Sequence, residues 1–324
     1  MAIFIAILMF IAAALLFESE REKLKITSCE YRITTEKRAE MTLVFLSDLH
    51  DYLPARHDPG KIMELIDAAR PDAVLLGGDM ITVSKHRKHP VPDTETAIKF
   101  ARNLREKYEV YYAEGNHEAR YLEKDPVGYA AYVKALTDLG VHYLPNAAAK
   151  ITVRKPDAAV PADDRAAENT AGKNSGNAAG NTAVVFGFTL PDECFQPLLF
   201  RQKETVSLPE GFLESVLHEG EQEEETYRIG MIHSPRYLKD AAKAGLDLVL
   251  SGHFHGGTIR LPDGSGLMTP QYQFFVKECS GTFTEGKTTM IVNRGLGTHS
   301  IKIRINDIPE VSVIHIETAD HLQT

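Results

Sequence analysis

The stretch LVFLSDLH, residues 43–50, joins an apolar run of strand length to two potential metal ligands, Asp48 and His50. A run this continuous is typical of a strand that is buried on both faces of a parallel sheet. The polar residues follow where the strand ends, and α/β sheets bind their ligands at the carboxyl ends of their strands. The stretch therefore predicts an α/β fold with a site at one end of the sheet.

The same arrangement returns four more times along the chain. The motifs GGDM, EGNHE, MIHS and SGHFHGG each follow an apolar run. With the opening stretch, these motifs supply seven potential ligands: Asp48, His50, Asp79, Asn116, His233, His253 and His255. Oxygen and imidazole groups without a thiolate suit Mn, Fe or Zn, and seven groups exceed what one tetrahedral ion needs. The set therefore predicts two divalent ions that share a ligand, an arrangement used for in-line displacement at phosphorus.

Between the motifs the chain alternates strand-like and helical segments. Apolar stripes predict helices over residues 60–70 and 127–139, and Asp93 is placed to cap a third helix that runs to about Lys107. Residues 25–33 alternate loosely and predict an edge strand. This alternation is typical of an α/β domain.

One long segment interrupts this pattern. Residues 155–181 are rich in Ala, Asn, Asp and Gly and nearly lack large apolar side chains, so they predict a disordered insertion. The strand-like residues 151–153 and 182–188 on either side are expected to pair as a hairpin around it. Residues 290–293 and 311–316 are the expected closing strands.

Composition limits the class of protein. A chain of 324 residues can bury a full core, and its net charge of −9 argues against non-specific nucleic-acid binding, which needs a basic surface. The three cysteines, Cys29, Cys194 and Cys279, are isolated, without a CxxC pair. They give no disulfide framework and favour a reducing compartment.

The N-terminal residues 1–17, MAIFIAILMFIAAALLF, are apolar throughout. They predict a helix of roughly 25 Å, at the short end of a membrane span. No charged region precedes them, which favours an uncleaved anchor over a cleaved signal peptide; a buried or interfacial helix is the remaining alternative. Because Arg21, Lys23 and Lys25 follow the run, the positive-inside rule predicts a cytoplasmic catalytic domain, with an extracytoplasmic one as the alternative.

In order, the motifs D-x-H, GD, GNHE, a lone His and GHxH resemble those of the calcineurin-like metallophosphoesterase superfamily. The resemblance runs from Thr42 to the C-terminus, apart from residues 155–181. GHFHGGTIRLP at residues 252–262 and NRGLGTHSIKIRIND at residues 293–307 are more specific. They resemble the membrane-associated bacterial branch of YkuE-like and YaeI-like proteins, which has a UDP-diacylglucosamine pyrophosphatase of lipid A synthesis as a distant relative.

The resemblance implies a four-layer α-β-β-α sandwich of two mixed sheets, with a dinuclear metal site at the carboxyl ends of the strands. Together with the segments described above, it gives the expected domain organisation. Residues 1–17 are a membrane anchor or signal-like segment, and residues 18–40 are a linker and edge strand. Residues 41–318 are a metallophosphoesterase domain interrupted by 155–181, and residues 319–324 are a tail.

The family's site residues carry over position by position. The resemblance assigns to the first metal Asp48, His50 and His255. It assigns to the second metal Asn116, His233 and His253. Asp79 would bridge both ions, and His117 would stabilise charge at the phosphate or protonate the leaving oxygen. A water or hydroxide between the metals would attack phosphorus.

Four positions bear on substrate preference rather than on the ligand set. Thr82 stands where much of the superfamily has an acidic residue, and Phe254 and Thr258 replace the branch's usual threonine and glutamine in the final motif. Arg260 is suited to a bidentate phosphate contact, with a surface arginine at the end of the loop as the equal alternative.

The function predicted from these residues is hydrolysis of a phosphodiester or pyrophosphate bond in a membrane-associated substrate, which includes lipid-linked ones. The alternatives are a UDP-diacylglucosamine-type lipid pyrophosphatase of the same class and a non-catalytic metal-binding scaffold on the same fold. A metal-dependent amidohydrolase would open with HxH, whereas here DxH comes first and HxH last. The sequence points to no protein partner.

Overall fold

The strand predicted at the opening motif is β2, Met41–Leu46, in the first of two six-stranded sheets. The structure is a computed structural model that describes residues 1–50, 59–84, 92–151, 183–196, 206–218, 225–298 and 302–319. The first sheet has the order β1 (Thr27–Thr35), β14 (Glu310–Thr318), β2, β3 (Ala73–Leu76), β4 (Glu109–Tyr112) and β5 (His142–Tyr143). Strands β2 to β5 run parallel, whereas β14 is antiparallel to β2, so the sheet is mixed.

The second sheet is mixed as well. Its order is β12 (Gly281–Glu285), β13 (Thr288–Val292), β9 (Leu248–Ser251), β8 (Tyr227–Ile232), β7 (Ala183–Phe188) and β6 (Ala147–Ile151). The predicted hairpin is confirmed, because Ile151 of β6 lies opposite Ala183 of β7. The insertion predicted between these strands, residues 155–181, lies outside the described residues, as does most of the predicted tail.

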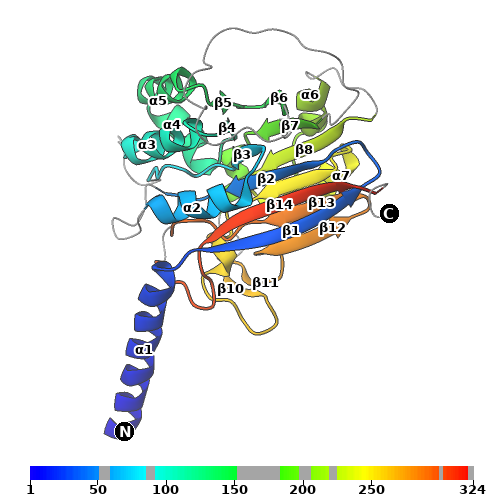
Figure 1. Cartoon of the computed structure of the whole chain (residues 1–324). Helices are drawn as coiled ribbons and strands as arrows, with labels where there is room; N and C mark the ends of the chain where they lie inside the picture. Colours follow the sequence, from blue (N-terminus) through cyan, green and yellow to red (C-terminus); the bar gives the residue numbers. More distant parts are fainter. Residues whose placement is uncertain are drawn as a thin grey trace.

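Three apolar clusters separate four layers, which confirms the predicted α-β-β-α sandwich (Figure 1). The helices packed on the first sheet are α2 (Pro59–Ala69), α3 (Thr94–Arg105), α4 (Asn116–Lys124) and α5 (Pro126–Asp138). Those packed on the second sheet are α6 (Phe212–His218) and α7 (Leu238–Lys243). The predicted cap is present, since the Asp93 carboxylate accepts hydrogen bonds from the first turn of α3.

The packing explains why the strand at residues 41–46 is apolar throughout. Leu43 and Phe45 face the second sheet, whereas Val44 and Leu46 face the helices, and all four side chains are fully buried. A strand with one solvated face would alternate instead. The sheet ends are thereby held rigidly, which fixes the residues that follow them.

Several short elements have no counterpart in the predictions. They are the hairpin of β10 (Gly266–Met268) and β11 (Phe274–Val276), the 3-10 turns η1 (Asp192–Phe195), η2 (Pro235–Tyr237) and η3 (His255–Gly257), and helices α4 and α6. The GNHE motif was expected to lie in a loop, but its residues 116–118 begin α4; the helix is mostly polar and lacks an apolar stripe of useful length.

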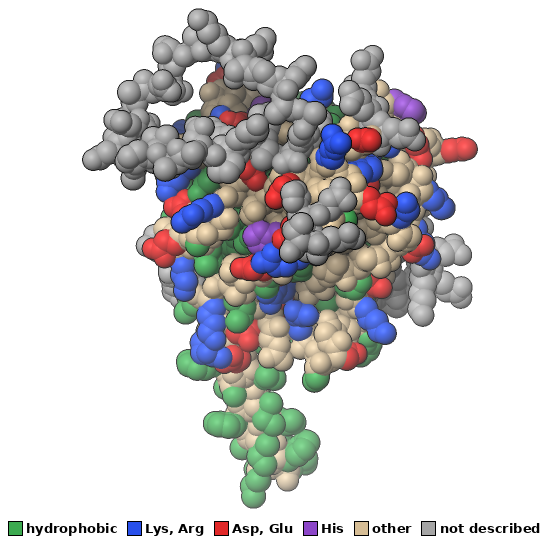
Figure 2. Space-filling view, turned by 45° about the vertical axis from the view of Figure 1, so that its right-hand side comes forward, with side chains coloured by type: hydrophobic (Ala, Val, Ile, Leu, Met, Phe, Trp, Pro, Cys, Tyr) green, Lys and Arg blue, Asp and Glu red, His purple; other side chains and the backbone are tan. Residues whose placement is uncertain are grey.

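The apolar N-terminal segment is helix α1, Ala2–Lys23, which continues past Phe17 into the expected linker. Its 22 residues span about 33 Å, enough to cross the hydrocarbon core of a bilayer. Residues 2–17 are exposed, and Figure 2 shows them as a rod of apolar side chains projecting from the domain, so α1 is not a core helix. Length and composition fit either a membrane span or a signal sequence.

The last turn of α1 packs on the domain. The Ser19 hydroxyl oxygen accepts the Arg304 backbone N–H at 3.0 Å, and the Glu22 carboxylate accepts the Asp307 backbone N–H at 2.8 Å. Both side chains are buried. The helix is therefore fixed in direction relative to the sheets.

Candidate metal centre

All seven predicted ligands lie buried at one end of the two sheets. They follow the carboxyl ends of five parallel strands: Asp48 and His50 after β2, Asp79 after β3, Asn116 after β4, His233 after β8, and His253 and His255 after β9. The first three strands belong to one sheet and the last two to the other. The face-to-face packing of the sheets thus brings the five strand ends into one place.

The first group comprises Asp48, His50 and His255, whose ligand atoms all lie within 4.8 Å of one another. His255 Nε2 is 3.3 Å from Asp48 Oδ1 and 3.0 Å from His50 Nε2. Two imidazole nitrogens this close share either a proton or a cation, because two lone pairs would repel. The three side chains therefore converge on one position suited to a metal ion.

The second group comprises Asp79, His233 and His253, again with ligand atoms within 4.8 Å. His233 Nε2 is 3.1 Å from Asp79 Oδ2. The amide oxygen of Asn116 is buried and receives no hydrogen bond from the described residues. A buried amide oxygen without a donor calls for a ligand that accepts its lone pair, as a divalent cation does.

Asp79 stands between the two groups. Its Oδ2 atom is 3.1 Å from His233 Nε2 and 3.9 Å from His50 Nε2, which belong to different groups. Its Oδ1 atom accepts the backbone N–H of His117 at 2.8 Å, which fixes the orientation of the carboxylate. One carboxylate oxygen therefore faces histidines from both groups.

Backbone carbonyls set the tautomers of two histidines. His233 Nδ1 lies 2.8 Å from the Gly77 oxygen, and His255 Nδ1 lies 3.3 Å from the Gly297 oxygen. Because a carbonyl only accepts, each Nδ1 carries a proton, and Nε2 is left to face the carboxylates. This is the orientation that metal-binding histidines take in proteins.

His117 has the opposite tautomer. The backbone N–H of Val83 donates to His117 Nδ1 at 2.7 Å, so in the neutral ring the proton sits on Nε2. That nitrogen is 3.9 Å from Asp79 Oδ2, and His117, His50 and Asp79 have potential ligand atoms within 4.8 Å of one another. The ring is therefore arranged to donate a hydrogen bond or a proton, not to bind a metal.

The electrostatics of the site favour bound cations. Burial raises the pKa of Asp48 to about 6, since ionisation there is disfavoured. Burial also opposes a charge on His233, but Asp79 and Asp48 together raise the pKa of this imidazole to about 10. Buried carboxylates that draw positive charge this strongly are well suited to divalent ions.

The backbone at the site is strained. Five of the seven predicted ligands have positive φ angles: Asp48 (54°), His50 (53°), Asp79 (53°), His253 (66°) and His255 (45°). Left-handed conformations are costly for residues with a side chain, and they cluster at functional sites. Close packing adds to the constraint, because a Cβ at Gly252 would lie 2.3 Å from Asp48 Oδ2.

Glu118 supports the site and was not singled out from the sequence. Its buried carboxylate accepts the backbone N–H groups of Asp79, Met80 and Gly115 at 2.9 to 3.0 Å and the hydroxyl of Tyr112 at 2.7 Å. It thereby ties the turn after β3 to the start of α4. The acidic fourth residue of GNHE was the only signal in the sequence.

Phe195 was also missed. Its ring lies 4.9 Å from the His253 ring and 6.0 Å from the His233 ring, and it covers the second group. It belongs to η1, a short turn whose sequence has no helical or strand periodicity. No sequence pattern could have placed it against these histidines.

The positions that depart from the family's pattern have other contacts. The Thr82 hydroxyl oxygen lies 3.4 Å from His50 Nδ1, where it helps to orient that ring. Phe254 is buried beside His253. Arg260 is half-buried near Asp307 and forms an antiparallel bridge with Gly266 at the start of β10.

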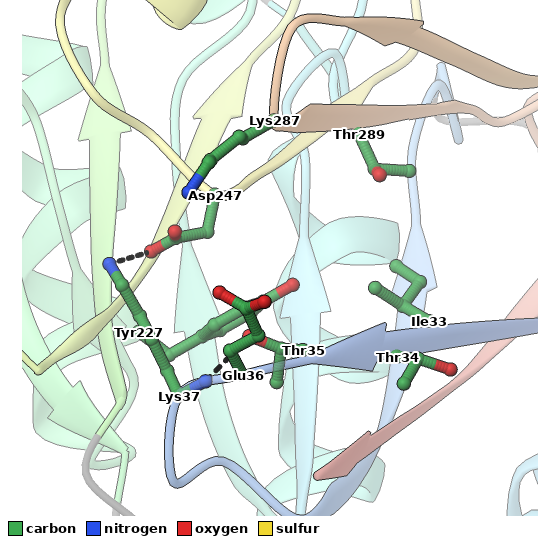
Figure 3. A pocket seen from close by; sticks show the side chains of 9 residues that line it. All are labelled: Ile33, Thr34, Thr35, Glu36, Lys37, Tyr227, Asp247, Lys287 and Thr289. Atoms are coloured by element: carbon green, nitrogen blue, oxygen red, sulfur yellow. Dashed lines mark hydrogen bonds and ion pairs between the residues drawn. The ribbon is translucent and has the colours of Figure 1, made fainter. Parts of the chain in front are cut away.

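A pocket lies at the end of the sheets opposite to the candidate ligands. It is an open pocket of about 340 Å³ near the starts of β8, β9 and β13 (Figure 3). Lys37 Nζ there donates to Asp247 Oδ2 at 2.7 Å and to the Thr226 carbonyl at 3.0 Å. Because this cation and carboxylate neutralise each other, we interpret the pair as a clamp between the β1–β2 turn and the second sheet.

Comparison with known proteins agrees with this picture. The profile described as "Calcineurin-like phosphoesterase" matches residues 41–257. The chain is 33% identical over 94 residues to the uncharacterized metallophosphoesterase YkuE of Bacillus subtilis (strain 168), a match covering 29% of this chain and 32% of YkuE. It is 23% identical over 313 residues to the uncharacterized metallophosphoesterase YkoQ of the same organism, covering 95% of this chain and 96% of YkoQ.

Among solved structures, TT1561 of Thermus thermophilus is 14% identical, with a TM-score of 0.42, over 80% of this chain and 91% of that one. The two Bacillus relatives confirm the predicted bacterial branch, and the profile covers more than half of the chain. The family match and the clustered carboxylates and imidazoles together support binding of divalent metal. It belongs to the calcineurin-like phosphoesterase family, and it is a hydrolase of phosphoester bonds.

Proposed function

We propose that the chain holds two divalent cations and hydrolyses a phosphodiester or pyrophosphate bond in a membrane-associated substrate. The position of Asp79 carries this proposal, because its Oδ2 atom faces His50 of one group and His233 of the other. A shared carboxylate is what holds two cations about 3.5–4 Å apart in two-metal sites. A single tetrahedral ion would leave several of the buried ligands unused.

The ligand assignment follows the two groups. Asp48, His50 and His255 would hold the first ion; Asn116, His233 and His253 would hold the second; Asp79 would contact both. The hydrogen-bonded tautomers of His233 and His255 fit these roles, as does the buried Asn116 Oδ1 atom, which receives no hydrogen bond from the described residues. Mn, Fe and Zn all suit this mixture of oxygen and imidazole donors.

The cations would supply Lewis acidity toward the phosphoryl oxygens and a nucleophile near neutral pH. The residues of the chain would orient the ester and manage its protons. His117 carries its proton on Nε2, directed at the site, and would donate it to the leaving oxygen. The strained, closely packed backbone around the ligands would keep this geometry in place between turnovers.

The membrane association rests on α1. We propose that α1 remains as an anchor and that residues 41–318 form the catalytic domain on the cytoplasmic side, because the basic residues Arg21, Lys23 and Lys25 directly follow the apolar run. A lipid-linked diester or pyrophosphate, such as a UDP-diacylglucosamine-type substrate, suits an anchored enzyme. Fusion of a reporter after Thr324 tests the orientation, and reporter activity found only outside the cell would reverse it.

The test of the proposed activity uses the purified full chain in detergent with Mn²⁺. The substrates are bis-p-nitrophenyl phosphate, p-nitrophenyl phosphate and UDP-diacylglucosamine. We expect the wild type to turn over the diester or the pyrophosphate and to bind two metal ions per chain. Asp79→Asn should abolish this turnover and bind fewer than two ions. The matched control is Asp138→Asn, the same chemical change at an exposed position on α5, which should keep both. Full activity in Asp79→Asn would overturn the proposal.

A further inference from the structure

The β10–β11 hairpin displays three aromatic side chains to solvent. Tyr272 is 41% exposed, Phe274 51% and Phe275 65%. Outside α1, the exposed large apolar residues of the described chain are Leu24, Leu122, Val127, Tyr272, Phe274 and Phe275. Half of them therefore occupy one short hairpin, whereas single exposed apolar residues are ordinary and need no explanation.

Two of these aromatic residues also have an unfavourable backbone conformation. Tyr272 and Phe275 both have φ angles of 59°, in the left-handed region. Glycine and asparagine occupy that region at little cost, whereas bulky side chains do so rarely. Aromatic side chains that are both exposed and held at this cost are best explained by an apolar surface that they contact.

The hairpin is also held firmly beside the metal centre. The buried Gln271 in its turn donates hydrogen bonds of 3.1 Å from Nε2 to the carbonyls of Cys194 and Gln196. Those residues flank Phe195, whose ring packs on His253. The aromatics therefore keep a fixed position relative to the metal ligands.

The strand register places the exit of α1 at the same end of the fold. β1 begins beside the start of β14, with Thr27 opposite Glu310, and β14 runs antiparallel to β2. The beginning of β1 thus lies at the carboxyl end of β2, where Asp48 and His50 are. Helix α1 ends at Lys23, just before β1, so it leaves the domain from the end that carries the metal centre (Figure 1).

A short hydrogen-bonded path joins the hairpin to α1. The N–H of Leu267 in β10 donates to the Ile259 carbonyl at 2.8 Å, and Ile259 pairs with Ile305. Two residues further on, the Asp307 N–H donates to Glu22 of α1. Figure 1 shows the hairpin and α1 at the same end of the molecule.

We propose that the β10–β11 hairpin inserts Tyr272, Phe274 and Phe275 into the lipid–water interface beside α1 and turns the metal centre toward the phospholipid headgroups. This inference rests on the proposed role of α1 as a membrane anchor. Aromatic rings favour the interface, where an apolar body meets a polar boundary. With α1 and the hairpin as two contacts, the domain is oriented as well as anchored, and phosphate esters of lipids are presented to the strand ends.

The experiment uses the fact that the chain contains no tryptophan. Phe275→Trp introduces a single reporter at the hairpin, and Val127→Trp places the matched reporter at an exposed apolar position on α5, away from α1 in Figure 1. Phe274→Trp is the second hairpin reporter, for use where F275W fails to fold. Each full-length variant is reconstituted in nanodiscs of phosphatidylcholine and phosphatidylglycerol, with and without brominated phosphatidylcholine.

We expect the F275W emission to shift to shorter wavelength in nanodiscs and to lose roughly half its intensity with brominated lipid, as for a ring buried about 5–10 Å into the interface. The V127W emission should stay unquenched. Equal, water-like emission from both reporters would overturn the inference. The readout does not depend on turnover, so quenching without hydrolysis would count against the proposed activity alone, and hydrolysis without quenching would count against the hairpin alone.

Discussion

The guanidinium of Arg304 donates a hydrogen bond of 2.6 Å to the carbonyl of Gly297. Gly297 in turn donates its N–H to the Asp48 carbonyl at 2.7 Å, and its oxygen lies 3.3 Å from His255 Nδ1. Because the Arg304 backbone N–H also donates to Ser19, one residue joins the last turn of α1 to the first group of metal ligands. Helix α1 and the candidate metal centre are therefore parts of one packed unit.

Arg304→Met should destabilise this unit strongly. The fully buried guanidinium donates to the Asp307 carboxylate and to four backbone carbonyls, those of Arg294, Gly295, Gly297 and Asp307. Removing one partner of a buried ion pair costs about 3–5 kcal/mol, because the other charge is left uncompensated. Denaturant unfolding in detergent measures the loss, and titration with Mn²⁺ should show weaker binding.

The control for that experiment is Arg32→Met. Arg32 pairs with Glu317 at 2.9 Å, but its side chain is 64% exposed. Exposed pairs contribute about 0–1 kcal/mol, so this variant should unfold close to the wild type. Equal losses in R304M and R32M would contradict the role given to Arg304.

Glu118→Gln should weaken metal binding without unfolding the domain. The carboxylate accepts four hydrogen bonds, and the glutamine amide nitrogen accepts none, so N–H groups in the turns after β3 and β4 lose their acceptor. Changing a group that orients a metal ligand typically lowers metal affinity or activity by about 10–100-fold. Mn²⁺ affinity measured by calorimetry tests this, with the exposed Glu123→Gln on the same helix as the control. An unchanged affinity in E118Q would show that the turns hold their shape without it.

The convergence of the seven candidate ligands could be predicted because each of them follows an apolar run, and buried parallel strands are the clearest pattern a sequence carries. The packing of the sheets then made neighbours of residues as distant as Asp48 and His255. Without the family resemblance, the strand-end rule would have placed these residues at one edge but would not have divided them into two groups.

Other features depend on contacts that leave no periodic signal. Glu118 and Arg304 act through backbone N–H and carbonyl groups of distant turns, and any sequence could supply those groups. The tautomer of His117 is set by the Val83 N–H, 34 positions away. Such contacts become visible only once the turns have their three-dimensional positions.

The pH dependence of stability should reveal Asp307. Burial raises the pKa of this carboxyl from the usual 3.8 to about 6, even though Arg304 acts in the opposite direction. Between these two pH values the folded state binds more protons than the unfolded state, so the free energy of unfolding contributed by Asp307 falls as pH rises. Above about pH 6 that contribution is fully lost.

Asp307→Asn removes this titration while keeping an oxygen that can accept from Arg304. Relative to this variant, the wild type should lose stability between about pH 4 and pH 6 and stay parallel to it above that window. Unfolding midpoints in urea across this range give the measurement, with Asp138→Asn as the exposed control. Parallel curves throughout would mean that Asp307 ionises as readily in the folded state as in the unfolded chain.

His117→Ala should separate proton donation from metal binding. Since His117 Nδ1 accepts the Val83 N–H, the ring offers the site a proton and no lone pair, so its loss should leave the metal content unchanged. General acids contribute about 10²–10⁴-fold, and least where the leaving oxygen is already a good leaving group. We therefore expect kcat to fall far more for an alkyl phosphodiester than for bis-p-nitrophenyl phosphate. His233→Ala is the contrasting variant. It should bind less metal and lower kcat by the same factor for both esters. An equal loss on the two esters in H117A, with metal retained, would assign His117 to charge stabilisation and not to protonation of the leaving group.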